Sequence, residues 1–373
     1  METRELSLFL KRNTLKPEAE VGGDITRRFA MNKVGRMVAA AQQDRTIRLY
    51  DAQQCEEMQR MQDDVLCTSI AFSPKGDIIA TGNVGRVVKL WDIRHGTPIA
   101  TLEGHSYPVL ALAFSPDGTK LVSGSGDTTL IIWDMDSLKP IKDLKGHSLY
   151  VVSCDWDPAG NRIVSSSVDA SIIEWDANTG ELLARHDDHR TAVQVVRFSP
   201  DGKRLASGSS DNNIIIWDAT GPLKPEITLR GHNEEVRALS FSYDGKYLAS
   251  GSADKDLFVW SLDTNSIEGE STTPSEVDGI EWYPDSYEFI TSDGTGAIAR
   301  WEVSSLDAML APFNELLKEI ESDPELIRKD EFIQKFENIR SQYSEETLQD
   351  KRLFYVNWQC KKALGLLKAK VRQ

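Results

Sequence analysis

The 373-residue sequence predicts an all-β propeller of seven four-stranded antiparallel blades, followed by a small C-terminal α-helical module. Two markers that recur in phase predict the ring. The first is an aromatic residue, followed by an acidic one in all but one copy, and its seven copies lie 41 to 43 residues apart. A period of this length indicates a repeat architecture. The copies are Tyr50-Asp51, Trp91-Asp92, Trp133-Asp134, Trp175-Asp176, Trp217-Asp218, Trp260-Ser261 and Trp301-Glu302.

The second marker is an aromatic residue that opens a turn signal, 19 residues before the first marker in six of the repeats. Phe114-Ser-Pro-Asp-Gly118 is one copy, in which Pro fixes φ and Asp-Gly favours the positive-φ corner of a hairpin. Apolar, β-branched runs flank the turn, a third run ends at the Trp, and a fourth precedes the next repeat. Four short strands in each period are typical of one propeller blade.

These repeats resemble the WD-repeat family over roughly residues 20 to 303, because Gly-His pairs open several of them and Trp-Asp pairs close their third strands. The pairs are Gly104-His105, Gly146-His147 and Gly231-His232, with Asp188-His189 as a variant. The resemblance implies a buried, hydrogen-bonded tetrad of His, Ser, Asp and Trp in each complete repeat. Four repeats have the full set: His105, Ser123, Asp127 and Trp133; His147, Ser165, Asp169 and Trp175; His189, Ser207, Asp211 and Trp217; and His232, Ser250, Asp254 and Trp260.

Ser, His and Asp also occur together in hydrolases, but four copies at a regular interval favour a structural role, since a buried imidazole and carboxylate are tolerable only when both are hydrogen-bonded. Three repeats lack the His. Ala40 stands at the Ser position of the first repeat, and Gly85 and Thr295 stand at the Asp positions of the second and the seventh. We expect these three blades to be the least stable.

The predicted domains are the propeller, residues 1–303, and the helical module, residues 304–373. After Trp301 the chain passes directly into helix-like sequence, so the seventh blade lacks one strand. The alternating apolar residues near the N-terminus predict a strand over residues 5–11 that closes this blade and leaves no open edge.

The apolar periodicity of the C-terminal module predicts about three helices, over residues 306–320, 325–343 and 345–371. Asp323-Pro324-Glu325 and Ser344-Glu345-Glu346 are typical helix starts. In the last helix an apolar stripe covers one face, whereas Phe354 and Trp358 lie toward a second face and are candidate partner contacts.

Composition and cysteine spacing exclude several kinds of site. The four cysteines, Cys55, Cys67, Cys154 and Cys360, are widely separated and indicate neither a disulfide framework nor a zinc site. The run His186-Asp187-Asp188-His189 resembles a metal-ligand cluster, but His189 fills the structural register. We therefore expect no metal, cofactor or catalytic residue. No apolar stretch approaches the ~20 residues that span a bilayer, and we expect a cytoplasmic location, with the nucleus as the alternative.

Charge is distributed unevenly along the chain. Residues 304–373 contain 12 Lys/Arg and 12 Asp/Glu, so the net charge of −15 belongs to residues 1–303. An acidic propeller disfavours nucleic acid and anionic membranes. By contrast, residues 351–373 contain seven Lys/Arg and no acidic residue. This basic helix would dock on an acidic propeller of the same or a neighbouring chain, or contact calmodulin-like proteins, membranes or nucleic acid.

Partners of WD-repeat proteins often use the face formed by the loops that lead into each first strand and by those between the second and third strands. Aligning the repeats predicts two surfaces on this face. The apolar arc consists of Val65, Leu66, Val84, Tyr107, Pro108, Leu149, Tyr150 and Val168, in blades two to four. The acidic sector consists of Glu234, Glu235 and Glu276, in blades six and seven. The arc is either a protein-binding surface or a set of side chains that cap their own blades.

The main functional hypothesis is a non-enzymatic scaffold that binds a protein partner on this face and joins a larger assembly through its C-terminal helices. The alternatives are an enzyme or small-molecule sensor that uses the central channel, which requires perturbed titratable groups there, and a ribonucleoprotein adaptor that uses the basic helix. The identity of the partner and the oligomeric state stay open.

Overall fold

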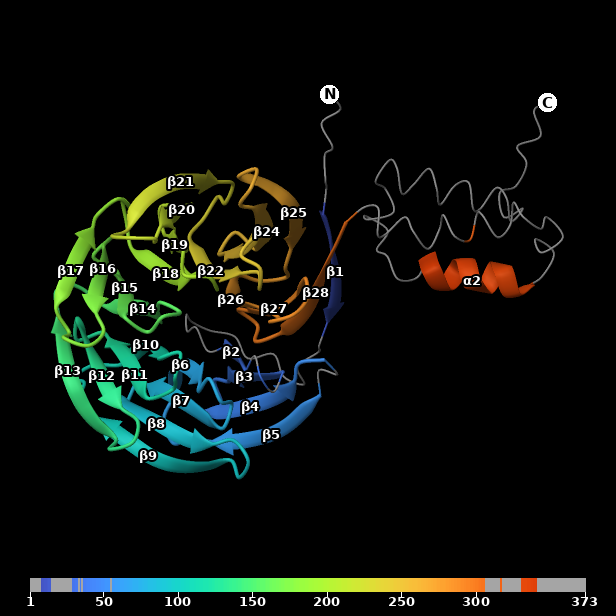
Figure 1. Cartoon of the computed structure of the whole chain (residues 1–373). Coiled ribbons are helices and arrows are strands. Elements are labelled where there is room, and N and C mark those ends of the chain that lie inside the picture. Colours follow the sequence, from blue (N-terminus) through green and yellow to red (C-terminus); the bar gives the residue numbers. More distant parts are fainter. Residues whose placement is uncertain are drawn as a thin grey trace, which may run out of the picture. The chain divides into compact units, whose positions relative to one another are not determined.

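The structure is a computed structural model, and it describes residues 8–14, 29–32, 34, 36–53, 56–305, 316 and 330–340. The predicted fold class is confirmed, because seven four-stranded antiparallel sheets are arranged as the blades of a propeller (Figure 1). By its internal contacts the chain divides into two compact units, one of which is Asn13–Arg300 and the other Met1–Arg12 with Trp301–Gln373.

In blades one to six the four strands follow chain order from the centre of the ring to its rim (Figure 1). Blade one contains β2 (Phe29–Asn32), β3 (Met37–Ala41), β4 (Thr46–Asp51) and β5 (Glu57–Gln62), and blade two contains β6 (Cys67–Phe72), β7 (Ile78–Asn83), β8 (Val87–Asp92) and β9 (Thr97–Glu103). Blade three contains β10 (Val109–Phe114), β11 (Lys120–Ser125), β12 (Thr129–Asp134) and β13 (Lys139–Lys145), and blade four contains β14 (Val151–Trp156), β15 (Arg162–Ser167), β16 (Ile172–Asp176) and β17 (Leu182–His186). Blade five contains β18 (Val193–Phe198), β19 (Arg204–Ser209), β20 (Asn213–Asp218) and β21 (Lys224–Arg230), and blade six contains β22 (Val236–Phe241), β23 (Tyr247–Ser252), β24 (Asp256–Ser261) and β25 (Ser266–Thr272).

The seventh sheet combines strands from both ends of the chain. Its order is β26 (Val277–Trp282), β27 (Glu288–Asp293), β28 (Ile298–Ser305) and β1 (Leu8–Thr14). The N-terminal strand thus runs through Thr14, three residues beyond the predicted end at residue 11, and residues 5–7 lie outside the described residues.

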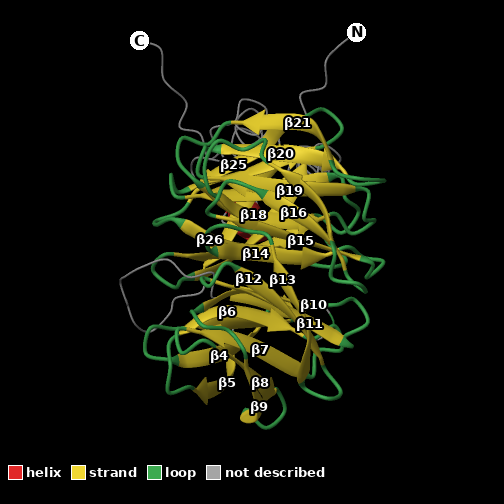
Figure 2. Ribbon diagram, turned by 90° about the vertical axis from the view of Figure 1, so that its left-hand side faces the viewer, coloured by secondary structure: helices red, strands yellow, loops and turns green. Residues whose placement is uncertain are grey.

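Turns between the first and second strands have the predicted geometry. The glycine of the turn signal adopts a positive φ of 69° to 73° in blades two to six, at Gly76, Gly118, Gly160, Gly202 and Gly245. Because a left-handed backbone costs glycine little, the Asp-Gly corner fixes the hairpin register. Seen from the side, the loops gather on two opposite sides of the strands (Figure 2).

Neighbouring blades approach closely where a glycine in one second strand faces a valine in the next first strand. A Cβ atom on Gly251 of β23 would lie 2.3 Å from Val277 Cγ1 of β26. The pairs Gly82–Val109, Gly124–Val151 and Gly208–Val236 repeat this arrangement, at 2.6 or 2.7 Å. Only a residue without a side chain permits such packing.

The repeated Trp also joins the blades. Trp175 of blade four is fully buried and belongs to the same apolar cluster as Val122, Leu130 and Ile132 of blade three. Trp133 of blade three packs in a cluster with residues of blade two in the same way. The marker aromatic is therefore a contact between blades, which explains why it recurs once in every period.

In the unit formed by Met1–Arg12 and Trp301–Gln373, the described residues include the helix α2 (Asp330–Arg340). It lies within the second predicted helix, and Leu316, which is helical, lies within the first. The rest of the predicted helical module lies outside the described residues. Phe336 of α2 is buried.

Candidate protein-binding face

Two sets of loops lie together on one face of blades two to seven. In each of these blades a backbone N–H of the loop between the second and third strands donates to a carbonyl of the loop that leads into the first strand, at 2.8 to 3.0 Å. The donor–acceptor pairs are Val84–Leu66, Gly126–Pro108, Val168–Tyr150, Ser210–Ala192, Ala253–Glu235 and Gly294–Glu276. Because the backbone repeats in this way, the blades differ on this face mainly in their side chains.

The four tetrads lie beneath these loops in blades three to six. In each, the His Nε2 atom is 2.7 to 2.8 Å from the Ser Oγ atom. The Trp Nε1–H donates to the same Oγ at 2.7 to 2.8 Å. The His Nδ1 atom is 2.9 to 3.2 Å from an Asp oxygen. Each tetrad therefore joins the first-strand loop to the second and third strands, and no nucleophile is exposed.

The direction of the protons follows from the chemistry of the partners. An ionised carboxylate only accepts, so the His donates from Nδ1 and its Nε2 accepts the proton of the Ser hydroxyl. Burial opposes ionisation of Asp169, but hydrogen bonds from His147, Ser171 and the Ser148 N–H hold the pKa of its carboxyl well below the usual range. Burial lowers the pKa of His189 and of His232, which keeps these imidazoles neutral.

Blades one and two replace the tetrad by ion pairs. In blade two, Asp63 occupies the His position, and its Oδ1 atom pairs with Lys89 Nζ, while Trp91 Nε1 donates to Thr81 Oγ1 at 2.9 Å. Lys89 stands where blades three to five have isoleucine. In blade one, Arg48 stands at that same position and pairs with Asp44 at 3.1 Å. A cation at one position of the third strand thus substitutes for the missing histidine.

The apolar arc presents five of its eight side chains to solvent. The exposed fractions are 53% for Tyr107, 48% for Tyr150, 46% for Leu149, 42% for Val84 and 37% for Val168. Val65, Leu66 and Pro108 are half-buried. The rings of Tyr107 and Tyr150 contact each other, with centroids 6.5 Å apart and planes inclined by 33°. The contact between these two rings joins the exposed apolar side chains of blades three and four.

The acidic sector is organised around Arg237. The Arg237 guanidinium donates to Glu235 at 2.6 Å and to Asp278 at 3.2 Å, and it also pairs with Glu276. Burial opposes its charge, but the hydrogen bonds to Glu235 and Glu276 raise the pKa of Arg237. Glu235 also accepts from Ser210 of blade five, at 2.9 Å. Glu234 is exposed to solvent. One arginine therefore orders carboxylates from blades six and seven.

The repeats match a known family over just over half of the chain. The model of the WD domain, G-beta repeat, matches residues 58–92, 96–134, 138–176, 180–218 and 223–261. The chain belongs to the WD-repeat family. These five matched segments include the four repeats with complete tetrads and the ion-paired second blade.

Two curated proteins are similar to short parts of this WD-repeat chain. Pre-mRNA-processing factor 19 of Oryza sativa subsp. japonica is 44% identical over 45 residues, which cover 12% of this chain and 8% of that protein. The U5 small nuclear ribonucleoprotein 40 kDa protein of Dictyostelium discoideum is 32% identical over 71 residues, 19% of this chain and 20% of that protein. The matches thus span a fifth or less of either relative.

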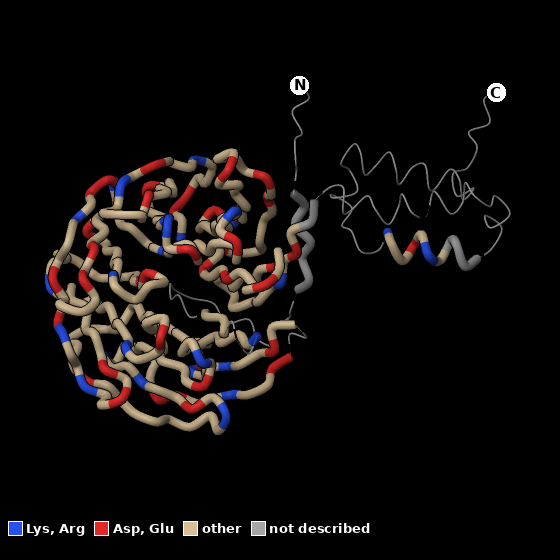
Figure 3. The backbone as a smooth tube through the Cα atoms, in the orientation of Figure 1, with Lys and Arg blue, Asp and Glu red and all other residues tan. Residues whose placement is uncertain are grey.

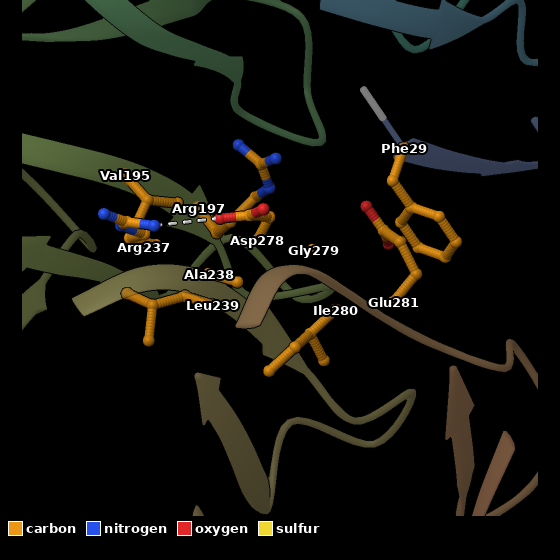
Figure 4. Close-up of a pocket in the computed structure, with 10 residues that line it drawn as sticks. All are labelled: Phe29, Val195, Arg197, Arg237, Ala238, Leu239, Asp278, Gly279, Ile280 and Glu281. Atoms are coloured by element: carbon orange, nitrogen blue, oxygen red, sulfur yellow. Dashed lines mark hydrogen bonds and ion pairs between the residues drawn. The ribbon is translucent and has the colours of Figure 1, made fainter. Parts of the chain in front are cut away.

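Titratable groups line one small cavity among the first strands of the WD-repeat ring. Arg197, Arg237, Asp278 and Glu281 line a cavity of about 30 Å³ together with Phe29 and other apolar residues (Figure 4). Burial raises the pKa of Asp278, although Arg237 opposes this. A cavity of this volume holds about two water molecules, whereas a substrate pocket measures about 300 to 1,000 Å³. Among these groups, Arg237 and Asp278 belong to the ion-pair network, whereas Arg197 donates to Ser153 Oγ at 3.3 Å.

The residues of the predicted metal-like cluster have separate partners. His186 Nε2 is 2.8 Å from Glu174, Asp187 pairs with Arg185 at 3.0 Å, and His189 belongs to its tetrad. Within the described residues no group of three or more His, Cys, Asp and Glu side chains is arranged to hold a metal ion. Cys67 and Cys154 are buried, and the Cys67 thiol donates to the Ser69 carbonyl at 3.3 Å. Cys55, Cys360, Phe354, Trp358 and the basic helix over 351–373 lie outside the described residues.

Sequence reasoning missed the charged residues that replace apolar ones in the repeat. Glu174 is buried in blade four at a position that holds Ile132 in blade three and Ile216 in blade five. It accepts from the Leu223 N–H of blade five at 3.1 Å, so it connects two blades. Lys89 and Arg237 were missed in the same way, and so was Asp63, which replaces the histidine of the other repeats. Comparing each position across all repeats would have identified them.

Proposed function

We propose that the chain is a non-enzymatic, protein-binding subunit of a multiprotein complex, and that its partner binds on the apolar arc. The exposed arc is the observation that carries the proposal. Five large apolar side chains on one face are exposed by 37% or more, and two of them are tyrosines in contact. A contiguous exposed apolar surface with aromatic anchors is typical of a protein-interaction site.

The similar proteins support a place in a nuclear assembly. One is named as a pre-mRNA-processing factor and the other as a small nuclear ribonucleoprotein component. We therefore propose a nuclear location in place of the expected cytoplasmic one, and a ribonucleoprotein assembly as the setting. No helix in the described part of the chain is long and apolar enough to span a membrane.

The C-terminal helices are proposed to join the chain to this assembly. Residues 351–373 are basic, with Phe354 and Trp358 as aromatic anchors, and basic amphipathic helices commonly bind partner proteins. A contact with RNA through the same segment is the second candidate, favoured by the ribonucleoprotein named among the similar proteins. An RNA contact would weaken strongly with salt and be lost on deleting residues 351–373.

A purification experiment tests the proposal. Full-length protein would be isolated from its native cell beside the Tyr107→Ala/Tyr150→Ala variant and a chain that ends at Val303, and co-purifying proteins identified by mass spectrometry. We expect a stoichiometric partner to be lost with the tyrosines. The matched control is Ile99→Ala/Ile141→Ala, since these residues of β9 and β13 are similarly exposed, by 49% and 42%, but lie on rim strands. A partner retained by the tyrosine variant would contradict the assignment to the arc.

A further inference from the structure

We propose that the face selects a basic protein segment with aromatic or large aliphatic anchors, in which the apolar arc takes the anchors and the acidic sector attracts the positive charges. This inference rests on the proposed function and deepens it, because it states the chemistry of the partner. Neither surface alone defines the partner, since an apolar surface accepts many segments and an acidic one attracts any cation.

The apolar arc contains an exposed pair of aromatic rings, Tyr107 and Tyr150, between blades three and four. Tyr107 and Tyr150 stand on either side of Gly126. A Cβ atom on Gly126 would lie 3.5 Å from Tyr107 and 3.6 Å from Tyr150, so both tyrosines border the glycine. Leu149 and Val168 extend the same surface within blade four. An aromatic or aliphatic side chain placed over Gly126 would contact both rings.

The acidic sector is ordered before any partner arrives. Glu235 and Glu276 share the guanidinium of Arg237, and Ser210 holds the second oxygen of Glu235. With Asp278, three carboxylates pair with the Arg237 guanidinium, and the exposed Glu234 is the next residue to Glu235, so carboxylates outnumber the guanidinium here. Because fixed carboxylates lose little side-chain entropy on binding, they favour a cationic partner.

The charge of the rest of the propeller points to the same partner. Residues 1–303 carry the whole net charge of −15. Acidic positions occur all around the ring (Figure 3). The field of such a surface increases the rate of encounter with basic segments and opposes phosphate backbones. A basic protein segment therefore fits this face, and a nucleic acid does not.

A peptide selection tests the inference directly. A phage library of random 12-residue peptides is selected on immobilised full-length protein at about 0.1 M salt, and the enriched peptides are synthesised with a fluorophore. We expect them to have a net positive charge beside at least one aromatic or large aliphatic residue. Tyr107→Ala/Tyr150→Ala should weaken their binding by at least about 10-fold. Gly126→Glu should weaken it similarly because the added side chain would lie against both tyrosines and cover them, whereas Gly126→Ala is tolerated.

The charge contribution has its own variants. Glu234→Lys combined with Glu276→Gln should weaken binding about 10-fold at 0.1 M salt and reduce its salt dependence. Asp263→Lys is the control, because Asp263 is an exposed acidic residue like Glu234 and lies between β24 and β25, on the opposite face. It should leave the affinity within about 2-fold of that of the unmodified protein. Circular dichroism melting of every variant verifies that the fold is retained.

The outcomes separate this inference from the proposed function. Acidic or uncharged peptides that depend on Tyr107 and Tyr150 would overturn the basic chemistry and leave the arc as the binding surface. Peptides insensitive to the arc variants, a library without an arc-dependent binder, or tighter binding of a single-stranded oligouridine to the same face would each overturn the inference. Whether the chain has a protein partner at all is decided separately, by the co-purification.

Discussion

Removing one buried hydroxyl group should lower the free energy of unfolding more in a tetrad than in the ion-paired second blade. In blade four, Ser165 Oγ bonds both Trp175 Nε1 and His147 Nε2, each at 2.8 Å, so Ser165→Ala leaves two buried groups without a partner. In blade two, Thr81→Val leaves only the Trp91 N–H. An unpaired buried group costs roughly 1–3 kcal/mol. We therefore expect Ser165→Ala to lower the free energy of unfolding by about 2–6 kcal/mol, and Thr81→Val by about half as much.

The measurement is unfolding in guanidinium chloride, followed by tryptophan fluorescence, with the midpoint shift compared at unchanged slope. Ser166→Ala is the control. Ser166 is the next residue of β15 and is fully buried, but its Oγ atom has no hydrogen-bond partner within the described residues, so its loss should be nearly neutral. Equal costs for Ser165→Ala and Ser166→Ala, or a larger cost for Thr81→Val, would refute the reasoning.

Three further predictions concern pH, the ion pair and the contact between blades. Because burial lowers the pKa of His189 and His232 below 6.5, the unfolded chain binds more protons than the folded chain below that pH. The free energy of unfolding should therefore be full above about pH 6.5 and fall on acidification by up to about 2.7 kcal/mol per pH unit. A urea midpoint as high at pH 5.5 as at pH 7.5 would contradict this. Lys89→Met should destabilise by about 3–5 kcal/mol in guanidinium chloride by leaving Asp63 unpaired, and adding Asp63→Leu should recover most of the loss; no recovery would argue against the pair. Gly251→Ala should cost about 1–3 kcal/mol through its clash with the next blade, measured by thermal unfolding, whereas Gly221→Ala, which has no atom within 4 Å of its added Cβ, should not.

The period of the sequence predicted the blades and the turn glycines, and the resemblance to the WD-repeat family implied the four tetrads. Those features recur, so each copy supports the others. The marker aromatics also lie at fixed distances from their Ser partners, as in Trp133 and Ser123. Local sequence therefore determines both the strand register and the pairing.

The features that occur once were not predictable in this way. Arg237 meets Glu276 and Asp278 only because blade six lies beside blade seven, and Asp63 meets Lys89 only because the loop that leads into β6 lies over β8. Such contacts depend on the placement of neighbouring strands and not on sequence separation. The sequence did contain one signal for these ion pairs, which is a charged residue at a position that is apolar in other repeats. Such a residue, if buried, requires an oppositely charged partner on a neighbouring strand or loop.

The contact between a glycine and the valine of the following blade has a consequence for how such a ring can change in evolution. Blades three and six contain both halves of the contact, a glycine that receives and a valine that inserts. A duplicated copy of either blade would therefore inherit a compatible boundary on each side. What limits the number of blades is then the angle through which the ring must close, and not the chemistry of the joints between them.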